Sequence, residues 1–140
     1  MVRSTALFLA VLALAGAASG CSSDDNDPGT SPTTPATTVT ETFSESVNPN
    51  GARVHPFAAQ APGTVTATLT TLEPNTTVLI GLGLGTWNGV SCAITISDEK
   101  ATQGVTLIGT ASAAGNLCVR VYDNGNLTQS ASYLVTVTHF

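Results

Sequence analysis

The sequence predicts an all-β protein, an antiparallel two-sheet β-sandwich of about eight short strands that follows an export sequence and a linker. From residue 39 onward, apolar and polar residues alternate with the period of a strand that has one buried and one wet face. Turns rich in Gly, Asn and Pro separate these runs. No segment keeps the period of an amphipathic helix.

Chain length and charge limit the number of domains and exclude some classes of ligand. The chain has 140 residues, enough for one folded domain, with 4 Lys and Arg against 9 Asp and Glu. So few basic residues supply no surface for nucleic acid, whose phosphates must be neutralised. They also supply no polybasic patch for anionic lipid.

The N-terminus predicts export and lipidation. Arg3 precedes an apolar run over residues 6–18, which is too short for a membrane span of ~20 residues and is typical of a secretory signal peptide, here residues 1–20. The segment Ala18-Ser19-Gly20-Cys21 resembles a bacterial lipobox, which implies cleavage before Cys21 and attachment of lipid there. The alternative is ordinary cleavage after Ala17, which leaves Cys21 as a free thiol.

Cysteine number supports the lipobox. The chain has 3 Cys, an odd number for an exported protein. Lipidation accounts for Cys21 and leaves Cys92 and Cys118 to form a disulfide in an oxidising compartment, although two unpaired buried thiols are the alternative. Because the two side chains fall on different strand faces by simple alternation, we expect the bond near a strand end or edge. Ser22 after the cysteine resembles outer-membrane sorting in Gram-negative bacteria.

Residues 21–38 predict a lipidated, disordered tether. The segment after Cys21 is rich in Thr, Pro and Asp and has no large apolar side chain, so it cannot bury enough surface to fold. Fully extended, it reaches at most roughly 50 Å.

Residues 39–140 form the predicted domain. Residues 64–70 alternate strictly, with Val65, Ala67 and Leu69 on one face and Thr on the other. In residues 78–85, apolar side chains alternate with glycines. The predicted strands are 39–46, 53–58, 64–71, 77–84, 91–97, 104–110, 116–122 and 132–139. The predicted core is Phe43, Phe57, Val65, Leu69, Ile80, Leu82, Leu107, Val119, Val121, Tyr133 and Val135.

Short motifs in this domain resemble the bacterial pre-peptidase C-terminal domains. These motifs are Phe57 at a strand end, Pro62-Gly63-Thr64-Val65, and Ala114-Gly115-Asn116-Leu117-Cys118-Val119-Arg120-Val121. The last segment is similar to a Gly-x-aromatic-x-Leu-x-Val strand of that family, with Leu117 at the aromatic position. The resemblance implies a β-sandwich that acts as a non-catalytic accessory module.

No residue pattern predicts catalysis. The 2 histidines, His55 and His139, fall on predicted strands, and we expect both at the surface or an edge. His139 is also the penultimate residue, where fraying would spoil a preorganised site. A small hydrolase using these histidines is therefore the least favoured hypothesis, and no cofactor is expected.

Asp123, Asn124 and Asn126 are weak calcium candidates. They surround Gly125, and their oxygens are hard ligands of the kind that calcium loops use. An Asn-Gly turn between two strands explains the same residues without an ion, and is favoured.

Trp87 is the candidate binding residue. It lies beside a strand in which Gly81 and Gly83 share one face. An exposed Trp is a platform for sugars or protein partners. The other interpretation, which is favoured, is that it folds back and covers the two glycines.

These inferences predict a non-catalytic binding module of the cell envelope. A lipid at Cys21 would tether it to a membrane, the outer one in a Gram-negative host, and its ligand would be an envelope glycan or protein. The alternative is a structural or assembly component of the envelope that acts through self-association.

Overall fold

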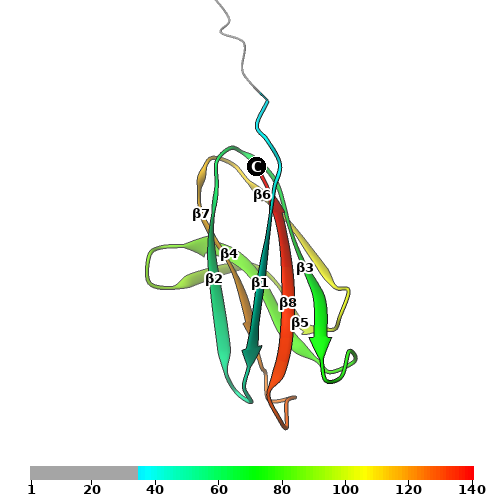
Figure 1. Cartoon of the computed structure of the whole chain (residues 1–140). Coiled ribbons are helices and arrows are strands. Elements are labelled where there is room, and N and C mark those ends of the chain that lie inside the picture. The colour runs from blue at the N-terminus through cyan, green and yellow to red at the C-terminus, as the bar shows by residue number, and fades with distance from the viewer. Residues whose placement is uncertain (1–34) are drawn as a thin grey trace, which may run out of the picture. The chain divides into compact units, whose positions relative to one another are not determined.

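The structure is a computed structural model that describes residues 35–140, and it is a β-sandwich as predicted (Figure 1). This part of the chain contains no helix and has eight strands. The strands are β1 (Val39–Val47), β2 (Ala52–Ala59), β3 (Gly63–Glu73), β4 (Ile80–Trp87), β5 (Cys92–Ala101), β6 (Thr106–Ala111), β7 (Gly115–Tyr122) and β8 (Ala131–His139).

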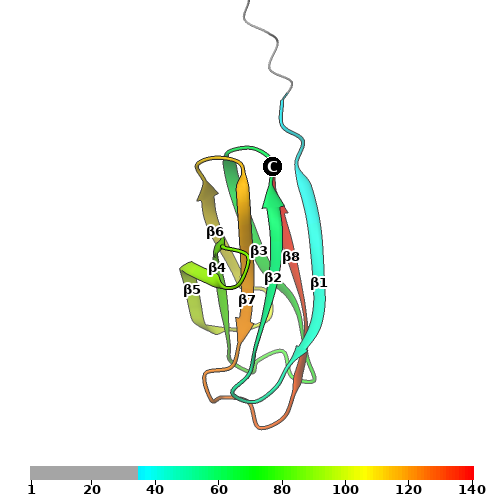
Figure 2. The ribbon, with the colours of Figure 1, turned by 90° about the vertical axis from the view of Figure 1, so that its left-hand side faces the viewer.

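The strands form two four-stranded sheets in which every neighbouring pair is antiparallel (Figures 1 and 2). Sheet A has the order β1-β8-β3-β6, and sheet B has the order β2-β7-β4-β5. Consecutive strands therefore often lie in different sheets, and each sheet contributes one face to the shared core. No helix in the described residues has the length and apolar character that a membrane span requires.

The core lies between the sheets, and the predicted core residues are there. Val65, Ala67 and Leu69 of β3 are buried in this core, while the intervening threonines are partly or fully exposed. Phe43, at the β1 edge, is only partly buried and packs against this core. The alternating sequence therefore determines which face of each strand is inside.

The fourth strand starts and ends three residues later than predicted, at Ile80 and Trp87. The side chain of Asn75 accepts a hydrogen bond from the Thr77 backbone N–H at 3.0 Å, and the Val78 N–H donates to the Asn75 carbonyl at 3.3 Å. This turn uses the backbone groups that a strand would need at residues 77 and 78.

Candidate binding site at the β4–β5 hairpin

The glycines of β4 allow the next strand to pack unusually close. A Cβ atom at Gly85 would lie 2.0 Å from the Ala93 carbonyl oxygen, so only glycine fits there. A Cβ at Gly81 would meet the Tyr122 ring at 2.3 Å, and one at Gly83 would meet Ile94 at 2.8 Å. The strand is thus buried on both faces. The prediction that Trp87 covers these glycines is wrong, because the nearest side chains there are those of Tyr122 and Ile94.

A bulge in β5 sets the direction of its first residues. Leu84 pairs with Ile96 and Gly85 pairs with Ile94, so Thr95 is an extra residue in β5. Its hydroxyl donates to the Leu84 carbonyl at 3.2 Å. Since the extra residue reverses the alternation, Ile94 lies on the outer face of sheet B over the glycines, whereas Ile96 lies against the core.

This reversal brings Cys92 to Cys118, and the predicted disulfide is confirmed. Cys118 pairs with Gly85 on the same outer face, and the two cysteine Cα atoms lie 5.8 Å apart. Cys92 is the first residue of β5, an edge strand of sheet B, which is the location expected from the sequence. The bond fastens the first residue of β5, next to the turn of the β4–β5 hairpin, to β7.

The hairpin tip is held by a side-chain cap. The Asn88 side-chain oxygen accepts hydrogen bonds from the backbone N–H groups of Val90 at 2.9 Å and Ser91 at 2.8 Å. Gly89 has φ of +94°, a left-handed conformation that favours glycine. Val90 at the tip is 88% exposed. The hairpin therefore presents an apolar tip on a constrained backbone.

Trp87 ends β4 and lines a shallow hollow of about 540 Å³ at the turn end of the β4–β5 hairpin. Two further strands contribute to it, Pro56, Phe57 and Ala58 from β2 and Asn116 from β7, and the lining is completed by Asn88 and Gly89. None of these side chains is charged. The sequence indicated Trp87 alone, because no local pattern shows that β2 and β7 lie beside the hairpin.

The calcium candidate Asp123 anchors two loops through backbone N–H groups. Its carboxylate accepts from Asn50 at 2.7 Å, Asn126 at 2.8 Å and Leu127 at 3.1 Å. Burial alone would raise the pKa of this carboxyl group, but the N–H donors outweigh burial and lower it. Its oxygens therefore face donors instead of other oxygen ligands.

The other two calcium candidates, Asn124 and Asn126, are engaged through their N–H groups. Asn124 uses its amide N–H groups to bond the Glu99 carboxylate and the Glu99 carbonyl, while Asn126 contributes its backbone N–H to Asp123. The Tyr122 hydroxyl also donates to Glu99 at 2.6 Å, and this bond, followed by that from Asn124, lowers the pKa of Glu99. Among residues 35–140, no three His, Cys, Asp or Glu side chains cluster closely enough to hold a metal ion.

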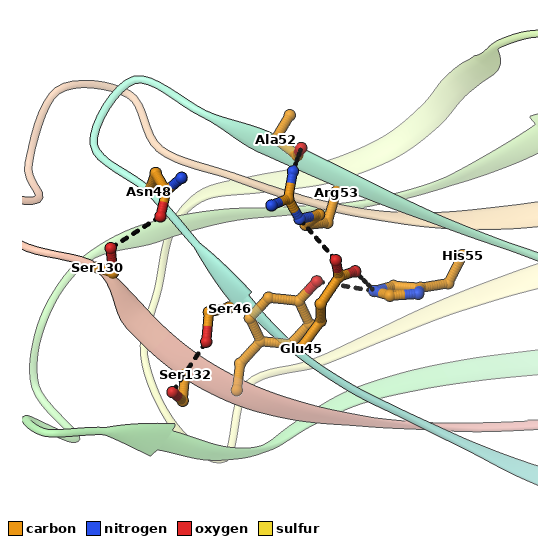
Figure 3. A network of polar contacts seen from close by, with 9 residues as sticks. Glu45, Ser46, Asn48, Ala52, Arg53, His55, Ser130 and Ser132 are labelled. Carbon is orange, nitrogen blue, oxygen red and sulfur yellow. Dashed lines mark hydrogen bonds and ion pairs between the residues drawn. The ribbon is translucent and has the colours of Figure 1, made fainter.

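His55 lies on edge strand β2, as expected, in a polar seam between the two sheets (Figure 3). Its ring stacks on Phe43 at 4.9 Å, and its Nε2 lies 2.7 Å from the Tyr133 hydroxyl. Burial lowers the pKa of His55 and raises that of Tyr133, so both side chains favour their uncharged forms and share this hydrogen bond. Next to it, Glu45 and Arg53 form an ion pair at 2.7 Å.

His139 differs from the expectation of a frayed surface residue. It is 2% exposed, lies in β8 and pairs with Val39 at the start of β1. Its Nε2 lies 2.9 Å from the Glu41 carboxylate, and its ring packs 5.1 Å from that of Phe57. Pairing with β1 therefore holds the last residues of β8 in the sheet. Both histidines pack against aromatic rings between the sheets, His55 against Phe43 and His139 against Phe57. They do not share a contact partner among these residues.

The predicted signal peptide, the lipidation site Cys21 and most of the tether lie outside the described residues. A comparison with protein-family models finds no match, and a comparison with curated proteins finds none either. The resemblance to pre-peptidase C-terminal domains therefore stays a prediction.

Proposed function

We propose that this chain is a non-catalytic, membrane-tethered binding module of the cell envelope and that it binds an uncharged saccharide at the Trp87 hollow. The observation that carries the proposal is the composition of this hollow, which joins an aromatic ring, a proline and two asparagines without any charged group.

A saccharide matches this chemistry because its ring has an apolar face and a polar rim. The indole ring offers a flat apolar surface for the sugar C–H groups, together with one N–H donor. Asn116 borders the same hollow, and an amide side chain both donates to and accepts from hydroxyl groups, while the Asn88 amide caps the hairpin turn. A charged ligand would find no counter-charge among these lining residues.

The rigidity of the hairpin also favours binding. Ligand affinity is reduced whenever a loop must be ordered on binding. Here the Cys92–Cys118 bond holds the start of β5 beside the turn, and the Asn88 cap holds the turn itself. The platform is therefore formed before a ligand arrives.

The membrane part of the proposal rests on the N-terminal sequence. A lipid on Cys21, followed by an extended tether, would keep the module within roughly 50 Å of the bilayer. With Ser22 after the cysteine, a Gram-negative host would carry it on the outer membrane. Envelope glycans are then the ligands within reach.

The experiment uses the fact that Trp87 is the only tryptophan of the chain. We would titrate the full chain, in detergent, with neutral and with acidic oligosaccharides and follow its tryptophan emission. The expected result is a saturable emission change and protection from acrylamide quenching with at least one neutral sugar. Emission that no saccharide changes would contradict the proposal.

Variants locate the site by calorimetry, which does not need the fluorophore. Trp87→Ala removes the platform and should abolish measurable binding. Trp87→Phe keeps a smaller aromatic face and should bind more weakly. Val90→Ala is the matched control, because Val90 is on the same hairpin but does not line the hollow. Equal binding by Trp87→Ala and the wild-type chain would refute the assignment.

A further inference from the structure

Strand β6 is an unprotected sheet edge. Of the four edge strands in residues 35–140, β2 contains Pro56, β5 has two register shifts, and β1 carries Glu41 and Glu45. These features oppose pairing with another chain. By contrast, β6 has the sequence Thr-Leu-Ile-Gly-Thr-Ala, with no charge and no proline, and an unbroken register with β3. Its Ile108 is 66% exposed.

The hydrogen-bond alternation shows which groups of β6 face this open edge. The Leu69 N–H donates to the Val105 carbonyl at 2.9 Å, and the Gly104 N–H donates to the Leu69 carbonyl at 2.8 Å. Since bonded pairs recur at every second residue, Leu107, Gly109 and Ala111 bond to β3. The short contact of 2.8 Å between the Thr68 and Thr106 hydroxyls fits the close approach of a non-bonded pair. The N–H and C=O groups of Thr106, Ile108 and Thr110 therefore point away from β3.

These three residues are arranged symmetrically. Thr106 and Thr110 flank Ile108 on the outer face, so an antiparallel copy centred on Ile108 would place isoleucine opposite isoleucine and threonine opposite threonine. In this register all three outward-pointing backbone pairs are hydrogen-bonding pairs.

The inner face is self-complementary as well. The same register places Leu107 of one copy opposite Gly109 of the other. Gly109 has no side chain, and Leu84 and Ile96 pack against its inner side, so the facing leucine meets an apolar surface beside the hollow of about 270 Å³ that these residues line.

We propose that a second copy of this chain pairs antiparallel with β6 about a two-fold axis through Ile108, which joins the two A sheets into one continuous sheet. The contact is isologous, so it closes as a dimer and does not propagate. It lies on a different strand from the Trp87 hollow, and it stands whether or not that hollow binds a saccharide.

Cysteine cross-linking of the full chain in its membrane tests the register. Ile108→Cys places two cysteines on a bonded pair about 5.5 Å apart between Cα atoms, within the range of about 4.4–6.8 Å that a disulfide spans. We expect a dimer on non-reducing gels. Thr106→Cys and Thr110→Cys should form the dimer only when both variants are expressed together, because each residue faces the other across the axis.

The control is Val90→Cys, another exposed apolar residue, which should give only the background seen with the wild-type chain and its Cys21. A dimer from Ile108→Cys no stronger than that of Val90→Cys would overturn the proposal. So would cross-linking of Thr106→Cys or Thr110→Cys alone.

Light scattering of the full chain in detergent supplies an independent readout. Ile108→Lys puts two ammonium groups opposite each other and should weaken the dimer by at least about tenfold, whereas Val90→Lys should not. A wild-type chain that is monomeric at every concentration, or a dimer unchanged by Ile108→Lys, would also overturn the proposal.

Discussion

Substitution of Asp123 by alanine should destabilise the domain strongly, although the residue is polar and follows the last position of β7. Its Oδ2 accepts from the Asn50 N–H, and its Oδ1 accepts from Asn126 and Leu127. The carboxylate therefore joins the β1–β2 connection to the β7–β8 connection, and it is only 8% exposed.

The magnitude follows from the fate of the three N–H groups. The Leu127 N–H is buried and would remain without a partner, which costs about 1–3 kcal/mol. The bonds of Asn50 and Asn126 are part-buried, so water would replace them incompletely and each loss would cost about 0.5–1 kcal/mol. Together, Asp123→Ala should lower the free energy of unfolding by about 3 kcal/mol.

The assay is urea unfolding of Asp123→Ala and Asp123→Asn beside the wild-type chain. Asparagine keeps an oxygen for Asn126 and Leu127 but turns an NH₂ group toward the Asn50 N–H. We expect it to cost about 1 kcal/mol, clearly less than alanine. An alanine variant within about 0.5 kcal/mol of the wild-type chain would refute the reasoning, because that is the range of an unremarkable surface substitution.

Acid should reveal the same interaction. The pKa of Asp123 is lowered from its ordinary value of 3.8. Its contribution to stability is therefore fully present above that value and is lost as the pH falls through the lower pKa of the folded state. The wild-type chain should lose more stability than Asp123→Asn in this acid range. Equal acid slopes for the two chains would contradict this assignment.

Addition of calcium tests whether Asp123 is a cation ligand. If Asp123 instead ligates a cation, calcium should raise the melting temperature of the wild-type chain but not that of Asp123→Ala. From the N–H donors that surround the carboxylate, we expect no such rise.

Two further predictions concern the hairpin. Cys92→Ala combined with Cys118→Ala removes a cross-link between residues with a sequence separation of 26, so the free energy of unfolding should fall by about 3.5 kcal/mol in the chain-entropy treatment. Reduction of the disulfide in the wild-type chain should reproduce this loss. A loss below about 1 kcal/mol would contradict the prediction. Gly85→Ala would force a Cβ to 2.0 Å from a backbone oxygen, so it should lower the free energy of unfolding in urea by about 3 kcal/mol or more. The control is Gly115→Ala, which should be nearly neutral because a Cβ there would have nothing within 4 Å. Equal effects of the two substitutions would show that β5 does not depend on this contact.

The alternating sequence was sufficient to predict the sandwich and its core. In β3, Val65 and Leu69 are four residues apart and therefore share a face, since a strand turns alternate residues to opposite faces. Burial of one thus predicts burial of the other. The same rule failed to locate the start of the fourth strand, because the Asn75 turn competes with strand pairing through side-chain hydrogen bonds that alternation does not represent.

The candidate site could be predicted only in part. Strict alternation left Cys92 and Cys118 on different faces, and the bulge at Thr95 that reconciles them has no marker in the sequence. Trp87 was recognisable as an unusual residue beside glycines, but its neighbours Pro56 and Asn116 depend on sheet order. His139 was mistaken for a frayed end because the pairing of β1 with β8 connects residues far apart in the sequence.

The glycines of β4 carry a local cost in stability. Glycine in a strand interior costs roughly 0.5–1 kcal/mol relative to alanine, and β4 has three of them. At Gly85 the gain is a close approach of β5, which brings Cys92 to Cys118 and fixes the segment that presents Trp87 and Val90. A sheet that needed only stability could fill that face with side chains, as the other strands do. Binding at the Trp87 hollow should therefore depend on this backbone approach: a folded Gly85→Ala chain should lose saccharide affinity more than Asp123→Asn, whose site lies at the opposite end of β7 from Asn116 and the hollow.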